Sequence, residues 1–388
     1  MKLISNRIYL DYNATAPLAE AVLQWYAKGA LPFGNPSSIH TSGKTSKKFI
    51  NETNRFLKDF FGMNEFQLFF HSGATEAINN IVKGFCFKQM RQKKKFHVIA
   101  FSSDHPSSVN QADQVELLGG EFHLLNPMQS GDFDKSKLIE YIQGLDGEVL
   151  LNYTHVNSVN GVIWSLEDAA DIKTQTGCLI HVDAVQMVGK IEGTYELETS
   201  LDYYTFSGHK FGALKGIGFT FVKDVNSSWE SILVGGGQQD ELRSGTENIH
   251  GIYSLKLALE EFKEKFNMEL LKSARVDLED ALKKEFPTIE LVSQDATRRN
   301  LNTLSLIIPK IKTDILITAF DMAKIEISSG SACSSGSIRP SQTLLAMGYS
   351  EEQAKSSIRI SLPLFMSEGE GIEIFEKIKV ILSRFLKS

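Results

Sequence analysis

Charged and polar side chains that could do chemistry follow four short apolar runs of the sequence. They are Asp104 and His105 after residues 97–101, His155 after 148–153, Asp183 after 178–182, and Lys210 after 203–206. Taken singly, each has an ordinary structural explanation, such as a helix cap or a surface charge. Four runs that end in this way indicate a shared site, because open α/β sheets bind ligands beyond the carboxyl ends of their strands.

A lysine, an aspartate and a histidine at one sheet edge suit the binding of pyridoxal phosphate. A partly desolvated Lys210 amine has a lowered pKa and can form a Schiff base with an aldehyde. The Asp183 carboxylate can hold the pyridinium nitrogen, and His105 can stack on the ring. Residues 72–75 open a helix, so their free N–H groups and a hydroxyl can bind the phosphate.

Alternating strands and helices must position these residues. Apolar runs predict strands at residues 66–70, 97–101, 148–153, 178–182, 203–206 and 218–222. Their near-continuous apolar character is typical of a sheet covered on both faces. Because helical patterns separate them, we expect a doubly wound α/β sheet.

The pattern changes from about Leu255. Apolar spacing predicts one long helix through about residue 284, then a second α/β unit with a strand at 303–308, a helix at 314–322 and a strand at 357–362. We therefore expect a large domain at 16–256, a small C-terminal domain at 257–388, and an N-terminal arm at 1–15.

Composition excludes several classes of protein. The 41 Lys and Arg against 47 Asp and Glu give a net charge of -6, which argues against nucleic acid as the primary ligand. No apolar stretch approaches the ~20 residues of a membrane span. Three cysteines cannot build a disulfide framework and suit a reducing cytoplasm. The histidines and cysteines lack the usual zinc spacings, so no metal site is expected.

Eight segments, in order along nearly the whole chain, resemble the cysteine desulfurases of iron–sulfur assembly, a class V aminotransferase-fold family. They lie at residues 9–15, 34–40, 72–76 (SGATE), 181–186 (HVDAVQ), 207–210 (SGHK), 243–246 (RSGT), 328–333 (SSGSAC) and 356–361 (SSIRIS). The resemblance implies a pyridoxal-phosphate-dependent transferase of fold type I. Such a fold has a large, doubly wound, mostly parallel sheet domain and a smaller α/β domain.

The resemblance also implies roles for individual residues. Lys210 would form the Schiff base, and Cys333 would take sulfur from L-cysteine as a persulfide. The remaining contacts would come from Asp183, Gln186, His105 and Ser158 on the cofactor; Ala74, Thr75, Ser207 and His209 on its phosphate; Thr246 on the phosphate of the other subunit; and Asn13, Ser158 and Arg359 on the substrate. The implied assembly is a homodimer that passes sulfur to an acceptor protein.

The three cysteines differ in their surroundings. Cys86 lies in an apolar helical pattern and Cys178 opens an apolar strand, so both are expected to be structural. Cys333 lies among small residues, which would let its thiol travel between substrate and acceptor. A free surface cysteine is the alternative interpretation, and the family resemblance favours the catalytic one.

The sequence departs from the family pattern after His155. Ser158 and Val159 replace the usual asparagine and glutamate. The resemblance therefore does not define the affinity for the substrate or its identity. A water molecule or Asn160 could take the place of the missing amide. A selenocysteine lyase, or another class V enzyme, is therefore the alternative function. A non-catalytic scaffold that docks through the basic residues 91–95 is the third.

Overall fold

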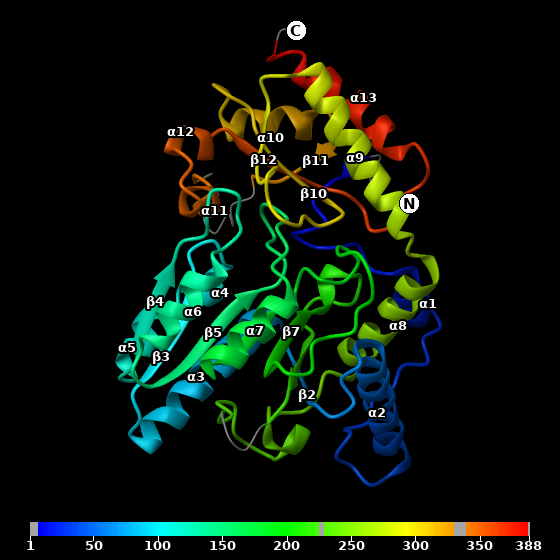
Figure 1. The fold of residues 1–388 in the computed structure, drawn as a ribbon. Helices are drawn as coiled ribbons and strands as arrows, with labels where there is room; N and C mark the ends of the chain where they lie inside the picture. Colours follow the sequence, from blue (N-terminus) through cyan, green and yellow to red (C-terminus); the bar gives the residue numbers. More distant parts are fainter. Residues whose placement is uncertain (1–6, 225–228, 330–338, 387–388) are drawn as a thin grey trace.

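The computed structural model describes residues 7–224, 229–329 and 339–386 of the chain. Its largest element is a seven-stranded sheet (Figure 1). In spatial order the strands are β2 (Gln67–His71), β8 (Gly218–Val222), β7 (Tyr203–Ser207), β6 (Leu179–Asp183), β5 (Glu148–Thr154), β3 (Phe96–Phe101) and β4 (Glu121–Leu125). Strands β7, β6, β5, β3 and β4 are mutually parallel, and β8 runs antiparallel to β7 and β2.

Helices cover both faces of this sheet, which explains why its inner strands are mostly apolar. One face packs on a cluster that includes residues of α1 (Glu20–Ala27), α2 (Thr41–Phe61), α6 (Lys135–Gln143), α7 (Leu166–Thr176) and α8 (Ile249–Lys265). The other face packs on α3 (Ala74–Gln92) and α5 (Ala112–Leu117), while the short α4 (Pro106–Val109) follows β3.

The C-terminal third has its own core around an antiparallel sheet, drawn in yellow to red above the large sheet in Figure 1. Its strands are β9 (Glu290–Leu291), β10 (Thr303–Ile307) and β12 (Ser357–Ser361). Its helices are α9 (Met268–Glu285), α10 (Thr313–Met322), α11 (Gln342–Ala346), α12 (Glu351–Ala354) and α13 (Glu370–Leu382). The predicted class, α/β with a large mostly parallel sheet and a smaller α/β part, is confirmed.

The N-terminal arm joins this smaller part. Strand β1 (Ile8–Tyr9) pairs in parallel with β11 (Ile325–Glu326), and Leu10 is fully buried in the core of the C-terminal third. The arm is thus held by main-chain hydrogen bonds and by apolar packing. The domain boundaries at residues 16 and 257 stay a prediction.

One local expectation was wrong, and the edge strand of the large sheet was missed. The long helix predicted through residue 284 is divided into α8 and α9, because Phe266 is extended and the Asn267 side chain caps α9 by accepting from the N–H of Leu270 (3.1 Å). The edge strand β4 was not predicted, since its alternating polar and apolar residues do not form a continuous apolar run. Among the described residues, no helix has the length and apolar character needed to cross a membrane.

Gly84 should be one of the positions where the large domain tolerates no side chain. A Cβ there would overlap the carbonyl oxygen of Glu230 and the indole ring of Trp229. We expect Gly84→Ala to destabilise the protein by about 1–3 kcal/mol, measured from its urea unfolding midpoint. Gly144→Ala is the control, because its Cβ would make only ordinary contacts, with the carbonyl oxygens of Tyr141 (3.5 Å) and Glu140 (3.6 Å). Equal midpoints for the two variants would contradict the packing described.

Candidate active site

The residues that follow the central strands lie at one edge of the large sheet. Asp183 ends β6, Ser207 ends β7, and His105 follows β3 by four residues; these strands are parallel. His71, at the end of β2, and Ser207 both pair with Gly218, so the carboxyl end of β2 reaches the same edge. The helix that begins after β2 therefore points its N-terminus into this region.

The Lys210 amine is held by main-chain carbonyls. Lys210 ends a short 3₁₀ helix (Gly208–Lys210) after β7, and its Nζ donates to the oxygens of Asn13 and Ala14, each at 2.8 Å. Burial lowers the pKa of Lys210 to about 8; the Arg359 guanidinium adds to this effect, and the Asp183 carboxylate opposes it. Roughly a tenth of such an amine is neutral at pH 7, the form that a nucleophile or base requires.

Asn13 connects three parts of the chain to this amine. Its side chain is buried, and its carbonyl also accepts from Gln186 Nε2 at 2.9 Å. Its N–H donates to Ser361 Oγ (3.0 Å) and its amide Nδ2 donates to Thr303 Oγ1 (2.8 Å). The N-terminal arm, the large domain and strands β10 and β12 therefore meet beside Lys210.

A second lysine, Lys190, is completely buried near the site. Its Nζ donates to Gln186 Oε1, and burial lowers the pKa of Lys190 well below its ordinary value. These contacts fix the Gln186 amide with its Nε2 group directed at Asn13. The hydrogen bond to the Asn13 carbonyl uses one of the two Nε2 hydrogens, so the second can serve a ligand.

Asp183 and His105 act electrostatically on the Lys210 amine and on each other. Burial raises the pKa of Asp183, and its Oδ1 accepts from the N–H of Val185 at 3.0 Å. His105 Nδ1 accepts from the N–H of Ser107 at 3.2 Å. Because a backbone N–H can only donate, the neutral imidazole carries its proton on Nε2. Desolvation lowers the pKa of His105, which favours this neutral form at pH 7.

The first turn of α3 offers donors for an anion at the same edge. The helix begins after Gly73, which has no side chain to cap it, so the N–H groups of Ala74 and Thr75 have no intrahelical partner. The helix dipole favours a negative charge there. A Cβ at Gly73 would meet nothing within 4 Å, so the approach is open. Ser207 and His209 come to this edge from β7.

Arg359 reaches the site from β12 of the smaller sheet. Its side chain is buried, its Nη2 pairs with Asp11 Oδ1 at 2.5 Å, and its Nη1 donates to the Ser158 carbonyl at 3.1 Å. Its Nε has no hydrogen-bond partner among the described residues. A buried guanidinium with unused donors can bind a carboxylate.

Ser158 stands where the family pattern led us to expect an asparagine. Its carbonyl oxygen accepts from Asn13 Nδ2 at 2.9 Å. Asn160 cannot replace the missing amide, because it is buried with Nδ2 against Met347 Sδ (3.3 Å) and Oδ1 accepting from the N–H of Val162 (3.0 Å). Of the two replacements considered for the missing amide, a water molecule bound next to Ser158 remains.

The other predicted residues lie further out or outside the described part. Arg243 donates from Nε to Glu76 Oε1 at 2.8 Å, which fixes the 243–246 segment against α3. Although burial opposes the charge, hydrogen bonds from Arg243 and Ser72 lower the pKa of Glu76 to about 2. Thr246 is exposed in this chain. Cys333 lies outside the described residues.

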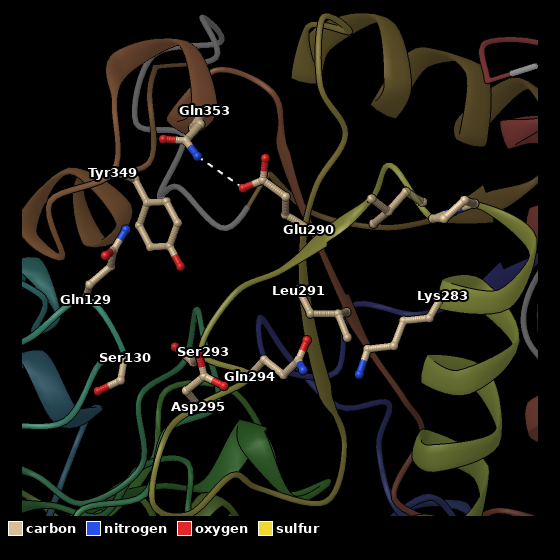
Figure 2. A pocket seen from close by; sticks show the side chains of 12 residues that line it. Gln129, Ser130, Lys283, Glu290, Leu291, Ser293, Gln294, Asp295, Tyr349 and Gln353 are labelled. Carbon is tan, nitrogen blue, oxygen red and sulfur yellow. Dashed lines mark hydrogen bonds between the residues drawn. The ribbon is translucent and has the colours of Figure 1, made fainter.

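A cavity of about 730 Å³ is formed by other residues, beside β9 and Tyr349 (Figure 2). Its lining is polar and includes Lys283, Glu290 and Asp295, and Gln353 Nε2 donates to Glu290 Oε2 at 3.1 Å. None of the predicted site residues lines it. We therefore place the candidate active site at the Lys210 edge of the sheet and not in this cavity.

Comparison with known proteins gives the family. The family model described as aminotransferase class-V matches residues 8–375. The chain belongs to the class-V aminotransferase family. It is 33% identical over 384 residues to "Cysteine desulfurase IscS" of Haemophilus ducreyi, which covers 96% of this chain and 92% of the relative. It is 32% identical over 383 residues to a "Cysteine desulfurase" of Nostoc sp., covering 97% and 93%.

Solved structures agree with the family assignment. A NifS-like protein from Rickettsia africae superposes with a TM-score of 0.83 at 27% identity, covering 97% of this chain and all of the other. A structure of SspA in complex with cysteine superposes with a TM-score of 0.78 at 28% identity, covering 93% of this chain and all of the other. The family resemblance predicted from the motifs is thereby confirmed.

Analysis of the sequence missed three polar residues of the candidate active site around Lys210. Asp11 pairs with Arg359, and it lies within the 9–15 segment already singled out by resemblance. Lys190 comes shortly after the apolar residues Met187 and Val188. A single lysine next to apolar residues could have indicated a buried amine. Thr303 gave no signal, because its role depends on the side chain of Asn13, which is distant in sequence.

The lowered pKa of Lys210 predicts the pH dependence of cofactor uptake by the apoprotein. The amine is protonated below its pKa of about 8 and neutral above it. The rate of pyridoxal phosphate uptake, followed by visible absorbance, should therefore rise up to about pH 8 and then level off. N-acetyl-lysine methylamide is the control, since its ordinary pKa of about 10.4 keeps its rate rising beyond pH 9. A protein rate that follows the control would contradict the lowered pKa.

Proposed function

We propose that this chain is a pyridoxal-phosphate-dependent cysteine desulfurase. It converts L-cysteine to L-alanine and transfers the sulfur to Cys333 as a persulfide, for sulfur delivery such as iron–sulfur cluster assembly. The observation that carries the proposal is the Lys210 amine of lowered pKa, beside Asp183 and His105, in a chain whose relatives are named cysteine desulfurases.

The donor set suits pyridoxal phosphate. Lys210 would hold the aldehyde carbon, Asp183 the ring nitrogen, and Gln186 the ring hydroxyl through its second Nε2 hydrogen. His105 would lie on the ring face. The uncapped first turn of α3 supports a phosphate site formed by the following residues: Ala74, Thr75, Ser207 and His209. When bound, pyridoxal phosphate supplies an electron sink for negative charge at the substrate α-carbon.

Each side chain then has a defined task. Arg359 binds the carboxylate of L-cysteine, and Asn13 and Ser158 line the substrate. Once the amino group of L-cysteine has replaced it on the cofactor, the neutral Lys210 amine would remove the α-proton, and His105 can donate a proton from Nε2. The Cys333 thiolate attacks the substrate sulfur, so that an S–S bond forms and the C–S bond breaks. The electron pair of the broken bond stays on the substrate carbon, which is protonated to give alanine.

L-Cysteine is the substrate that we favour, and SspA, a structural relative, was solved with cysteine. Ser158 supports a second candidate, a selenocysteine lyase, because the smaller side chain removes an amide next to Arg359. The two functions differ in the amino acid that is turned over. Alanine formed from L-selenocysteine but not from L-cysteine would favour the second.

We further propose a homodimer in which Thr246 reaches the phosphate site of the other subunit. Its exposure supports this, as do the exposed apolar side chains of Phe33 (86%) and Ile39 (89%). A sulfur-acceptor protein and a cytoplasmic location complete the proposal, and both rest on the desulfurase relatives.

Replacing Cys333 tests the sulfur transfer. With L-cysteine and a reductant, Cys333→Ala should release sulfide at least ~100-fold more slowly than the wild type while its cofactor absorbance stays unchanged. Cys178→Ala is the control, because burial raises the pKa of the Cys178 thiol to about 11 and leaves little thiolate. Full sulfide release by Cys333→Ala would refute the role of Cys333.

Replacing Arg359 tests the carboxylate contact. Arg359→Lys keeps the charge but loses the fork of donors, so KM for L-cysteine should rise ~10–100-fold with a smaller change in kcat. Arg55→Lys, an exposed arginine on α2, is the matched control and should match the wild type. An unchanged KM in steady-state assays of Arg359→Lys would exclude this role.

A further inference from the structure

Two histidines and a glutamate form a cluster at the opposite end of the strands from Lys210. His97 is the second residue of β3, and Glu121 and His123 lie on the edge strand β4. The strands are parallel, with His97 aligned to Glu121 and Ile99 aligned to His123. Because alternate residues of a strand share a face, the three polar side chains project from the same face of the sheet.

Three ligand atoms of these side chains converge. His97 Nδ1 lies 3.0 Å from His123 Nε2, and Glu121 Oε2 lies 3.6 Å from the first and 3.9 Å from the second. A tetrahedral zinc ion with bonds of about 2.0–2.1 Å places its ligand atoms ~3.3 Å apart. The three atoms therefore form a triangle close in size to one face of that tetrahedron.

Both imidazole rings are held by contacts through their other nitrogens. His97 Nε2 lies 3.2 Å from the carbonyl oxygen of Asp146, and His123 Nδ1 lies 2.7 Å from the hydroxyl of Tyr141 on α6. A carbonyl can only accept, so the His97 proton sits on Nε2 and its Nδ1 presents a lone pair to the cluster. Contacts of this kind orient histidine ligands in metal sites.

We propose that His97, Glu121 and His123 bind a divalent transition metal ion, with zinc as the expected ion. Two imidazoles and one carboxylate form a ligand set typical of zinc, whereas magnesium and calcium prefer oxygen ligands. The histidine side chains are 6% and 15% exposed and that of Glu121 is 70% exposed, so the fourth position opens to solvent on the glutamate side.

The ion would link the edge strand β4 to β3 and, through Tyr141, to α6. The cluster lies at the amino ends of β3 and β4, while the active-site residues follow the carboxyl ends. The site therefore acts on stability and not on the desulfurase reaction. The usual zinc spacings miss it, because its ligands come from two strands with 23 residues between His97 and Glu121.

Titration of the holoenzyme tests this site. After treatment with a chelator, the wild type should bind one Zn²⁺ per chain by calorimetry, and Zn²⁺ should raise its Tm. His123→Asn should abolish both effects and keep the wild-type sulfide release. Tyr141→Phe should weaken binding about 10-fold by removing the outer contact. Glu148→Gln, which changes a nearby glutamate on β5, is the control and should bind like the wild type.

Two results would overturn the proposal. One is the absence of Zn²⁺ binding to the wild type. The other is equal binding by His123→Asn and Glu148→Gln, which would place the ion elsewhere. Substitution with Co²⁺ identifies the ligands: nitrogen and oxygen ligands give only weak visible bands, whereas a strong thiolate charge-transfer band would assign the ion to a cysteine and contradict the site.

Discussion

Two main-chain carbonyls, those of Asn13 and Ala14, hold the amine of Lys210, and the arrangement of the site depends on that contact. Carbonyl oxygens position an amine without the full charge of a directly bonded carboxylate, which would raise its pKa. Burial and the Arg359 charge therefore outweigh the more distant Asp183, and the pKa falls to about 8. The result is an amine that is fixed in place and still available in its neutral form.

The same contact makes the catalytic geometry depend on how the parts of the chain fit together. Asn13 donates to Ser361 of β12 and to Thr303 of β10, while its carbonyl accepts from Lys210 and Gln186 of the large domain. Pairing of β1 with β11 anchors the arm further. The substrate-binding Arg359, which lies on β12, is thus held at a set position relative to the Lys210 amine.

The sequence predicted most of what depends on continuous apolar runs and on short motifs. The six predicted strands of the large sheet all form, because each is buried on both faces. Prediction from the sequence failed where the structure depends on residues that are distant in the chain. Strand β4 alternates polar and apolar residues at a sheet edge, and the break before α9 depends on the capping by Asn267. Residues such as Lys190 and His123 gain their chemistry only from neighbours that the fold brings to them.

The central claim is that the amine of residue 210 carries the cofactor, and borohydride reduction followed by peptide mapping tests it most directly. Reduction of the holoenzyme makes the covalent link permanent, so mass spectrometry locates the pyridoxyl group on one peptide. The account predicts the label on Lys210 alone. Lys190 is the internal comparison, because it is a second buried lysine with a lowered pKa in the same site. Label on Lys190, or no label on either lysine, would contradict the account.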